Sequence, residues 1–372
     1  MHILICPDKF KGSLSATQVC DALEKGIYQG NSLYEVTKLP LADGGEGTLD
    51  VLQAVLGGEL ISVLVNDPLF RSIKADYLWM ESRKKAFIEM SRASGLPLLS
   101  NSERDPLKTT SFGTGQLILD ALERGATDIV LTVGGSATND AGIGMAAALG
   151  YAFLDENGND LAPIGENLIH IQQIIPSEFL SQFSHVKFQV ATDVENPLNG
   201  PEGAAFIFAA QKGGTVDSIR YLDNGLNNIA RLFDQKGNIS QQAGAGAAGG
   251  LGAGANYFLQ AEIISGSQMV LEAVDFNQNL IKADIIITGE GKIDEQTWYG
   301  KLVAEVLKRA QKAKKPCVLI CGMIENAEMR PPEFQGFPIY AISNFAKNQE
   351  DSMLNADQYL QLIGETMAKK GF

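Results

Sequence analysis

The chain has 372 residues, which is longer than most single domains, so two domains are expected. A composition with 45% hydrophobic and 20% charged residues excludes a disordered or collagen-like protein. The formal net charge of −14 opposes binding to polyanions, so we expect neither a nucleic-acid partner nor a membrane partner.

The N-terminal sequence MHILICPDK lacks the basic start of a secretory signal, and no apolar run approaches the roughly 18 residues that span a bilayer. We therefore expect a cytoplasmic protein. Four cysteines are too few for a disulfide framework. Cys317 and Cys321 lie four apart on an apparent strand, roughly 13 Å, which is too far for one disulfide. Buried thiols are expected.

The first part of the chain alternates between strand and helix signals. Residues 2–6 and 34–41 are apolar runs that predict strands, and residues 49–56 have the spacing of an amphipathic helix. Ser15 and Gln18 predict a capping box at the start of another helix. This order is typical of an α/β layer fold with a largely parallel sheet.

The pattern then changes to residues 59–65, 72–80 and 84–90, three extended runs that predict an antiparallel meander. Five further strands are predicted at residues 128–133, 185–194, 283–291, 316–322 and 337–343.

We therefore predict an α/β fold with two lobes. Residues 1–66 plus 275–372 are expected to form a discontinuous Rossmann-like domain with a largely parallel sheet. Residues 67–274 are expected to form an inserted, mixed α/β domain, with the active site in the cleft between the two domains.

Common nucleotide-binding signatures are missing from the sequence, which has neither a P-loop nor the protein-kinase motifs. Gly244, Gly246 and Gly249 match the dinucleotide fingerprint, but they follow SQQA rather than a strand. A glycine- and alanine-rich segment that lets another backbone or a phosphate approach is favoured instead. The three histidines are scattered, so no zinc site is expected.

Short loops at predicted strand ends combine glycine with carboxylates, amines or hydroxyls. In α/β sheets the ligand crevice lies outside the carboxyl ends of the strands. The five loops are residues 8–13, 42–48, 134–140, 192–197 and 288–294. The first four have simpler explanations, which are a solvated loop, a helix entry, an N-cap by Asn139 and a turn before proline, but five together favour a site.

The loops differ in the chemistry that they offer. Two lysines in residues 8–13 can hold anionic oxygens, and the N–H groups that open the helix after residues 42–48 favour an anion. Residues 134–140 combine small residues, hydroxyls and a helix start, which suits a phosphate. Asp193 can orient or deprotonate a hydroxyl, or hold Mg²⁺.

Seven ordered motifs support a family resemblance. They are PDKFKGSLSA, ADGGEGT, DPLFR, GGSATND, TDVENPL, GAGAAGGLGAG and TGEGKID-x-QT. From residue 2 to about residue 370 the chain resembles the bacterial glycerate kinase family, type I. The resemblance implies ATP-dependent phosphorylation of D-glycerate with Mg²⁺, and two α/β lobes with the site between them. Phe70 stands where the family has glycine, which bears on how Arg71 is presented.

Roles are assigned from this resemblance together with the loop positions. Asp193 is the expected base or hydroxyl-orienting residue, with Asp8 as its competitor, and Lys11 and Arg71 are expected at the glycerate carboxylate. The catalytic group is Asp193, Asp8 and Lys11, and the substrate-binding group is Arg71, Lys9, Ser13 and Asp43. The nucleotide-binding group is Gly134, Gly135, Ser136, Asn139, Gly289 and Lys292, and the Mg²⁺ group is Asp43, Glu290 and Asp294.

The expected enzyme is a phosphotransferase with an alcohol acceptor, whose small-molecule partners are D-glycerate and ATP. The resemblance favours 2-phosphoglycerate over 3-phosphoglycerate as the product. Two alternatives stay open: an NAD-dependent oxidoreductase, and a two-lobed protein that binds a small anion without turnover. The sequence leaves the oligomeric state open.

Overall fold

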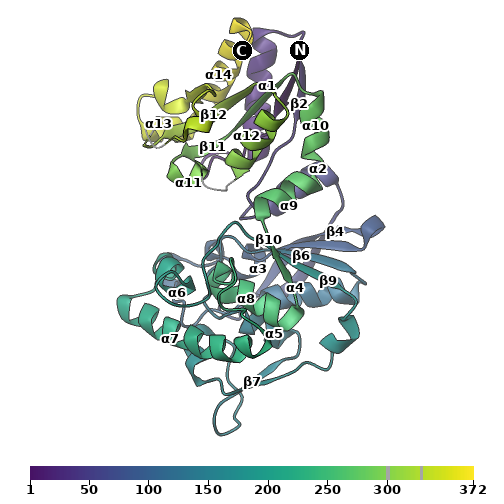
Figure 1. The fold of residues 1–372 in the computed structure, drawn as a ribbon, viewed down its shortest axis with the longest axis vertical. Helices are drawn as coiled ribbons and strands as arrows, with labels where there is room; N and C mark the ends of the chain where they lie inside the picture. The colour runs from purple at the N-terminus through teal and green to yellow at the C-terminus, as the bar shows by residue number, and fades with distance from the viewer. Residues whose placement is uncertain (299–301, 327–329) are drawn as a thin grey trace. The chain divides into compact units, whose positions relative to one another are not determined.

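A computed structural model of the chain describes residues 1–298, 302–326 and 330–372. The backbone divides into two compact units (Figure 1). The first unit comprises residues 1–43, 50–56 and 267–372, and the second comprises residues 44–49 and 57–266. These limits differ from the predicted boundaries because residues 59–66 pair within the sheet of the second unit, and residues 267–274 belong to the first.

The first unit contains a five-stranded sheet in the order β13-β12-β11-β1-β2. Its strands are β1 (His2–Ile5), β2 (Glu35–Lys38), β11 (Ile285–Ile293), β12 (Cys317–Ile324) and β13 (Ile339–Ala341). All four strand pairs are parallel. The chain order reverses between β1 and β11, so a topological switch point lies there, and the predicted Rossmann-like layer is confirmed.

Helices pack on this sheet because its alternating apolar side chains must be covered on both faces. On one face, Ile3 and Ile5 pack in a core shared with α1 (Ala16–Gly30) and α14 (Ala356–Lys370). Ser15 and Gln18 form the predicted capping box of α1. The other helices of this unit include α9 (Gly266–Ala273), α10 (Phe276–Lys282), α11 (Glu295–Trp298), α12 (Leu302–Lys312) and α13 (Gln349–Leu354).

The second unit contains a six-stranded mixed sheet in the order β10-β9-β6-β5-β4-β3. Its strands are β3 (Glu59–Asn66), β4 (Ser72–Met80), β5 (Lys85–Glu89), β6 (Asp128–Thr132), β9 (Lys187–Ala191) and β10 (Glu262–Ile264). Strands β3, β4 and β5 form the predicted antiparallel meander, and β5, β6, β9 and β10 run parallel.

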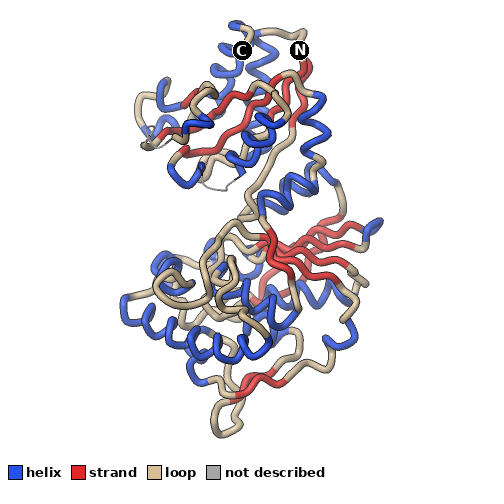
Figure 2. Tube along the Cα trace, viewed as in Figure 1, coloured by secondary structure: helices blue, strands red, loops and turns tan. Residues whose placement is uncertain are grey.

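The second unit also contains several helices. They are α3 (Ser91–Ser94), α4 (Phe112–Glu123), α5 (Ile143–Ala148), α6 (Ala204–Phe208), α7 (Val216–Phe233) and α8 (Ala247–Leu259). Helix α2 (Thr48–Leu56) begins in the second unit and continues in the first. A separate antiparallel ribbon consists of β7 (Ala152–Leu154) and β8 (Gln173–Ile175) and lies apart from the six-stranded sheet (Figure 2).

The glycine-rich segment forms a kinked α8 in which Ala248, Gly249 and Gly250 have left-handed conformations. A Cβ atom at Gly249 would lie 2.1 Å from the carbonyl oxygen of Thr138, so a side chain there would collide with the backbone of residues 138–139. The residues just before Gly244 form turns rather than a strand, so the context of a dinucleotide fingerprint is missing. The expected close approach of another backbone is confirmed.

The structure also bears on the expectations for the cysteines and for membrane-spanning helices. Cys6, Cys20, Cys317 and Cys321 are free and buried, as the sequence predicted for Cys317 and Cys321. Among the described residues, no helix combines the length and the apolar character that crossing a bilayer requires.

Candidate active site

The carboxyl ends of β5, β6, β9 and β10 lie at one edge of the mixed sheet because these strands are parallel. Thr132 and Ala191 are partners in the register of β6 and β9, so the two chains leave the sheet side by side. Gly134 and Asp193 follow these residues by two positions each. The sheet therefore brings the third and fourth predicted loops together.

Asp193 is oriented by a residue from the neighbouring strand end. Ser265, which follows β10, donates a hydrogen bond from its Oγ to Oδ1 of Asp193 at 2.8 Å. This contact fixes one carboxylate oxygen of the predicted base. Sequence analysis missed Ser265, since only the pairing of β10 with β9 reveals its position.

The loop that begins at Gly134 lies against the loop of residues 44–47. A Cβ atom at Gly134 would lie 2.5 Å from the Cα atom of Gly45, so this contact requires glycine. Gly135 has a left-handed φ of 73° and Ser136 is only 6% exposed. The two loops therefore form one compact surface at the strand ends of the second unit.

Asn139 does not cap a helix, because α5 begins four residues later with Gly142 as its N-cap. The N-cap alternative is therefore wrong. The side chain of Asn139 is fully buried, and neither its amide oxygen nor its amide nitrogen has a hydrogen-bond partner within the described part of the chain. Unpartnered buried polar groups are rare in native proteins and are often found at functional sites.

The N–H groups that open α2 were expected to favour a ligand anion, but Glu89 accepts two of them. The N–H groups of Gly47 and Leu49 donate to the two carboxylate oxygens of Glu89, each at 3.0 Å. Ser91 Oγ donates to the same carboxylate at 2.8 Å. The expected ligand role of these two N–H groups is therefore wrong, because a buried glutamate that sequence analysis missed already fills it.

In the first unit, Asp8 follows β1 at the topological switch point. Its N–H donates to the carbonyl oxygen of Gly289 at 2.8 Å, and its Oδ1 accepts from the Lys9 N–H at 2.6 Å. Burial raises the pKa of Asp8 to about 7, and the neighbouring charges of Asp43 and Glu290 add to this effect. Lys9 Nζ lies 3.9 Å from Oδ1 of Asp43. The first, second and fifth loops thus supply a common charged cluster.

Lys292 and Asp294 lie in a second charged group at the end of β11. Lys292 Nζ lies 3.5 Å from Oδ2 of Asp294 and also forms an ion pair with Glu325.

Gly289 allows β12 to lie close to β11, since a Cβ atom at Gly289 would be 1.8 Å from the carbonyl oxygen of Ile320. Over the described ranges, no three or more histidine, cysteine or acidic side chains are arranged to hold a metal ion.

The remaining predicted substrate residues have structural partners. Arg71 forms ion pairs with Asp67 at 2.5 Å and with Glu103 at 2.6 Å, so two carboxylates already bind its guanidinium group. Ser13 Oγ donates to the carbonyl oxygen of Met353 at 2.6 Å, which anchors the loop of residues 8–13. Lys11 is exposed in this loop.

Sequence analysis also missed Lys212, which is almost completely buried. Its Nζ donates to Ser136 Oγ at 2.8 Å and to the carbonyl oxygen of Thr138 at 2.6 Å. The QKGG sequence around it offers no recognisable signal, because the partners lie more than 70 residues away in the chain.

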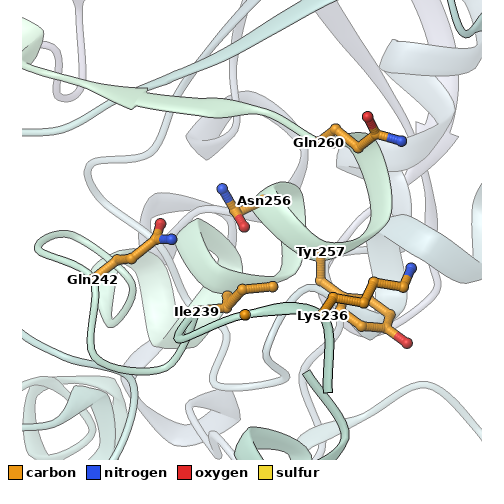
Figure 3. A pocket seen from close by; sticks show the side chains of 7 residues that line it. Lys236, Ile239, Gln242, Asn256, Tyr257 and Gln260 are labelled. Atoms are coloured by element: carbon orange, nitrogen blue, oxygen red, sulfur yellow. The ribbon is translucent and has the colours of Figure 1, made fainter. Parts of the chain in front are cut away.

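One pocket of the second unit has a volume of about 460 Å³ (Figure 3). Lys236 and Tyr257 lie side by side at its wall, with Nζ 4.0 Å from the centre of the ring. Its other lining residues are Gly237, Ile239, Gln242, Asn256 and Gln260. None of these residues belongs to the five loops.

Comparison with known proteins shows the family to which the chain belongs. A family model described as the glycerate kinase family matches residues 3–370. Glycerate kinase from Bacillus cereus is 39% identical over 370 residues, which cover 99% of this chain and 97% of the relative. Glycerate 2-kinase from Escherichia coli is 42% identical over 87% of this chain and 86% of the relative.

A solved structure from Salmonella typhimurium LT2 that carries the name glycerate kinase 2 has a TM-score of 0.85 and 39% identity. The match covers 100% of this chain and 98% of that one. Since the family model spans nearly the whole chain and the relatives are similar over most of their length, the chain belongs to the glycerate kinase family, whose members are phosphotransferases.

Proposed function

We propose that the protein phosphorylates D-glycerate with ATP and Mg²⁺. The observation that carries this proposal is the adjacency of two parallel strand ends in the second unit. There, a glycine- and hydroxyl-bearing loop follows β6 and Asp193 follows β9. A phosphate-binding loop beside a carboxylate that accepts a hydroxyl proton is what phosphoryl transfer to an alcohol requires.

The glycerate hydroxyl is assigned to Asp193, whose carboxylate is already oriented by Ser265. The carboxylate of glycerate is assigned to Lys11 rather than to Arg71, because Asp67 and Glu103 already bind the guanidinium of Arg71. Gly134, Gly135 and Ser136 are assigned to the phosphates of the nucleotide. Small residues there allow the loop backbone to approach the phosphate oxygens.

Mg²⁺ fits the cluster at the switch point of the first unit better than it fits Asp294. Burial is the largest cause of the raised pKa of Asp8, and the negative charges of Asp43 and Glu290 raise it further, as expected where carboxylates repel one another. A divalent cation is favoured where carboxylate oxygens repel one another, and Mg²⁺ needs only one or two carboxylates plus phosphate oxygens. When bound, it would neutralise charge on the phosphates. Asp294 is paired with Lys292.

The product is proposed to be 2-phosphoglycerate, as the name of the Escherichia coli relative suggests. The test is ADP release from ATP and D-glycerate, with and without Mg²⁺, followed by phosphorus NMR of the product. We expect Mg²⁺-dependent ADP release and a phosphate on the secondary hydroxyl. A phosphate on the primary hydroxyl would contradict the choice of product.

Binding of glycerate without ADP release would instead indicate the small-anion binding protein. A nicotinamide enzyme is disfavoured because the glycine fingerprint lacks its strand. Titration with NADH should therefore show no saturable binding, and tight binding would count against the proposed function.

A further inference from the structure

Lys212 is a buried amine that connects two distant parts of the second unit. It ends the short turn Ala210–Lys212 after α6, and only 2% of the residue is exposed. Its two hydrogen bonds reach Ser136 Oγ and the carbonyl oxygen of Thr138, on the loop assigned above to phosphate. Lys212 therefore holds this loop from the interior of the unit.

No carboxylate in the described part of the chain forms an ion pair with the ammonium group of Lys212. Asp140 acts on it only at longer range. The Asp140 carboxylate accepts hydrogen bonds from the N–H and Oγ of Ser111 and from the N–H groups of Gly142 and Gly144. Burial lowers the pKa of Lys212 to about 7. An anion near the loop would stabilise the positive charge of Lys212 and offset the free-energy cost of burying that charge.

Ser136 is polarised by this contact. A hydroxyl group has one donor and two acceptor positions, and Lys212 uses an acceptor position. The proton of Ser136 is then directed toward another acceptor, and a hydroxyl that accepts from an ammonium group is a stronger donor. Thr138 Oγ1 and the Asn139 amide are buried without hydrogen-bond partners among the described residues.

We propose that Lys212 is a positioning residue for phosphate binding: its ammonium group holds residues 134–139 in place and polarises the Ser136 hydroxyl, which donates to a phosphate oxygen of the nucleotide. The lysine lies behind the loop and acts through Ser136. This inference rests on the proposed function, because it takes the loop to be the phosphate site.

The test compares K212M, S136A, the double variant and the control K187M, whose exposed lysine lies at the opposite end of β9. MgATP binding is measured by calorimetry without glycerate, and steady-state kinetics are measured for both substrates. K212M should weaken ATP binding and raise the ATP KM by about 10- to 100-fold, the range for a hydrogen bond to a charged group. The glycerate KM should change less than about 3-fold, and K187M should match wild type.

The double variant distinguishes a role through Ser136 from a general effect on folding. If Lys212 acts through Ser136, the double variant should bind ATP no more than about 2-fold more weakly than K212M. Fully additive losses, or an unchanged ATP affinity in K212M, would overturn the inference. If thermal unfolding shows that K212M does not fold, the MgATP affinity of S136A tests the inference instead. A wild-type MgATP affinity in S136A would overturn the inference.

The two proposals fail in different ways. A wild-type protein that binds MgATP but releases no ADP with glycerate would refute the proposed function and leave the role of Lys212 measurable by calorimetry. A wild-type protein that turns over glycerate, with K212M unchanged in ATP affinity, would refute only the role of Lys212.

Discussion

Phe70 adopts a left-handed conformation with φ of 61° in the turn between β3 and β4. This conformation costs a non-glycine residue about 1–2 kcal/mol. The contact between the rings of Phe70 and Phe112, whose centroids lie 5.9 Å apart, offsets part of this free-energy cost. The turn also holds Arg71, whose N–H donates to Asp67 Oδ1 at 2.9 Å.

Two variants separate the backbone strain from the ring contact. F70A removes the ring and keeps the strain, whereas F70G removes both. We expect F70G to be more stable than F70A by about 1 kcal/mol in urea unfolding. Equal stabilities would show that the turn is not strained.

Asp193 provides the corresponding residue-scale prediction for catalysis. D193N keeps the shape of the side chain but removes its ability to accept a proton. We expect kcat to fall by roughly 10²–10⁴ with little change in the ATP KM, measured by ADP release. S265A should give a smaller loss because it removes only the orienting hydrogen bond. Near-wild-type activity of D193N would move the base elsewhere, with Asp8 as the next candidate.

Lys212 predicts a pH dependence of stability. Its pKa is lowered to about 7 in the folded protein by burial, which the charge of Asp140 partly opposes, against 10.5 for the unfolded chain. At pH values between these two pKa values, the Lys212 amine is protonated in the unfolded chain but largely neutral in the folded protein. The contribution of Lys212 to the free energy of unfolding therefore rises with pH.

The stability difference, wild type minus K212M, should therefore increase from pH 7 to pH 10 by at most about 1.4 kcal/mol per pH unit. Urea unfolding at several pH values measures it. Taking the difference removes the effect of other titrating groups, such as the buried cysteines. A constant difference would mean that Lys212 keeps its charge throughout the pH range.

At the scale of elements, helices α1 and α14 pack unusually closely because glycine lies at their contact. A Cβ atom at Gly26 would lie 2.0 Å from the carbonyl oxygen of Gln361. The side chains of these helices also form the core against one face of the parallel sheet. Since β1 is the element that precedes α1 in the chain, this packing helps to fix the strand that Asp8 follows.

G26A should therefore destabilise the protein by about 1–3 kcal/mol, the usual range for overpacking, even though alanine favours helices. G336A is the matched control, because no atom lies within 4 Å of a Cβ atom built at Gly336. Thermal unfolding compares the two variants. A G26A variant as stable as G336A would show that α14 can shift without cost.

At the scale of the whole molecule, the residues assigned to the proposed reaction are divided between the two units. Asp8, Lys11 and Asp43 belong to the first unit, whereas Ser136 and Asp193 belong to the second. A kinase must also exclude water from the transferred phosphoryl group. The substrates should therefore draw the two units together.

We expect small-angle scattering to show a lower radius of gyration with D-glycerate and a non-hydrolysable ATP analogue together than with either one alone. A mixture with propionate, which has the carbon chain and carboxylate of glycerate but neither hydroxyl, is a control for non-specific effects of anions. Identical scattering curves under all conditions would contradict closure during the reaction.

Much of the fold could be predicted from local patterns. The Ser15 capping box, the three strands of the meander and the parallel sheet follow from residue spacing, because the hydrophobic period sets helix or strand. The domain limits could not be predicted in the same way. Residues 59–66 carry an ordinary strand pattern, and nothing local tells which sheet they pair with.

The same difference between local and long-range information applies to the candidate site. By itself, the sequence determined that carboxylates, amines and glycines follow strand ends, since these loops are contiguous in the chain. Only the tertiary structure decided that Glu89 fills the start of α2, that Ser265 orients Asp193 and that Lys212 reaches the loop of Ser136. Each of these contacts joins residues more than 40 positions apart, and strand pairing and burial, rather than local propensity, bring such residues together.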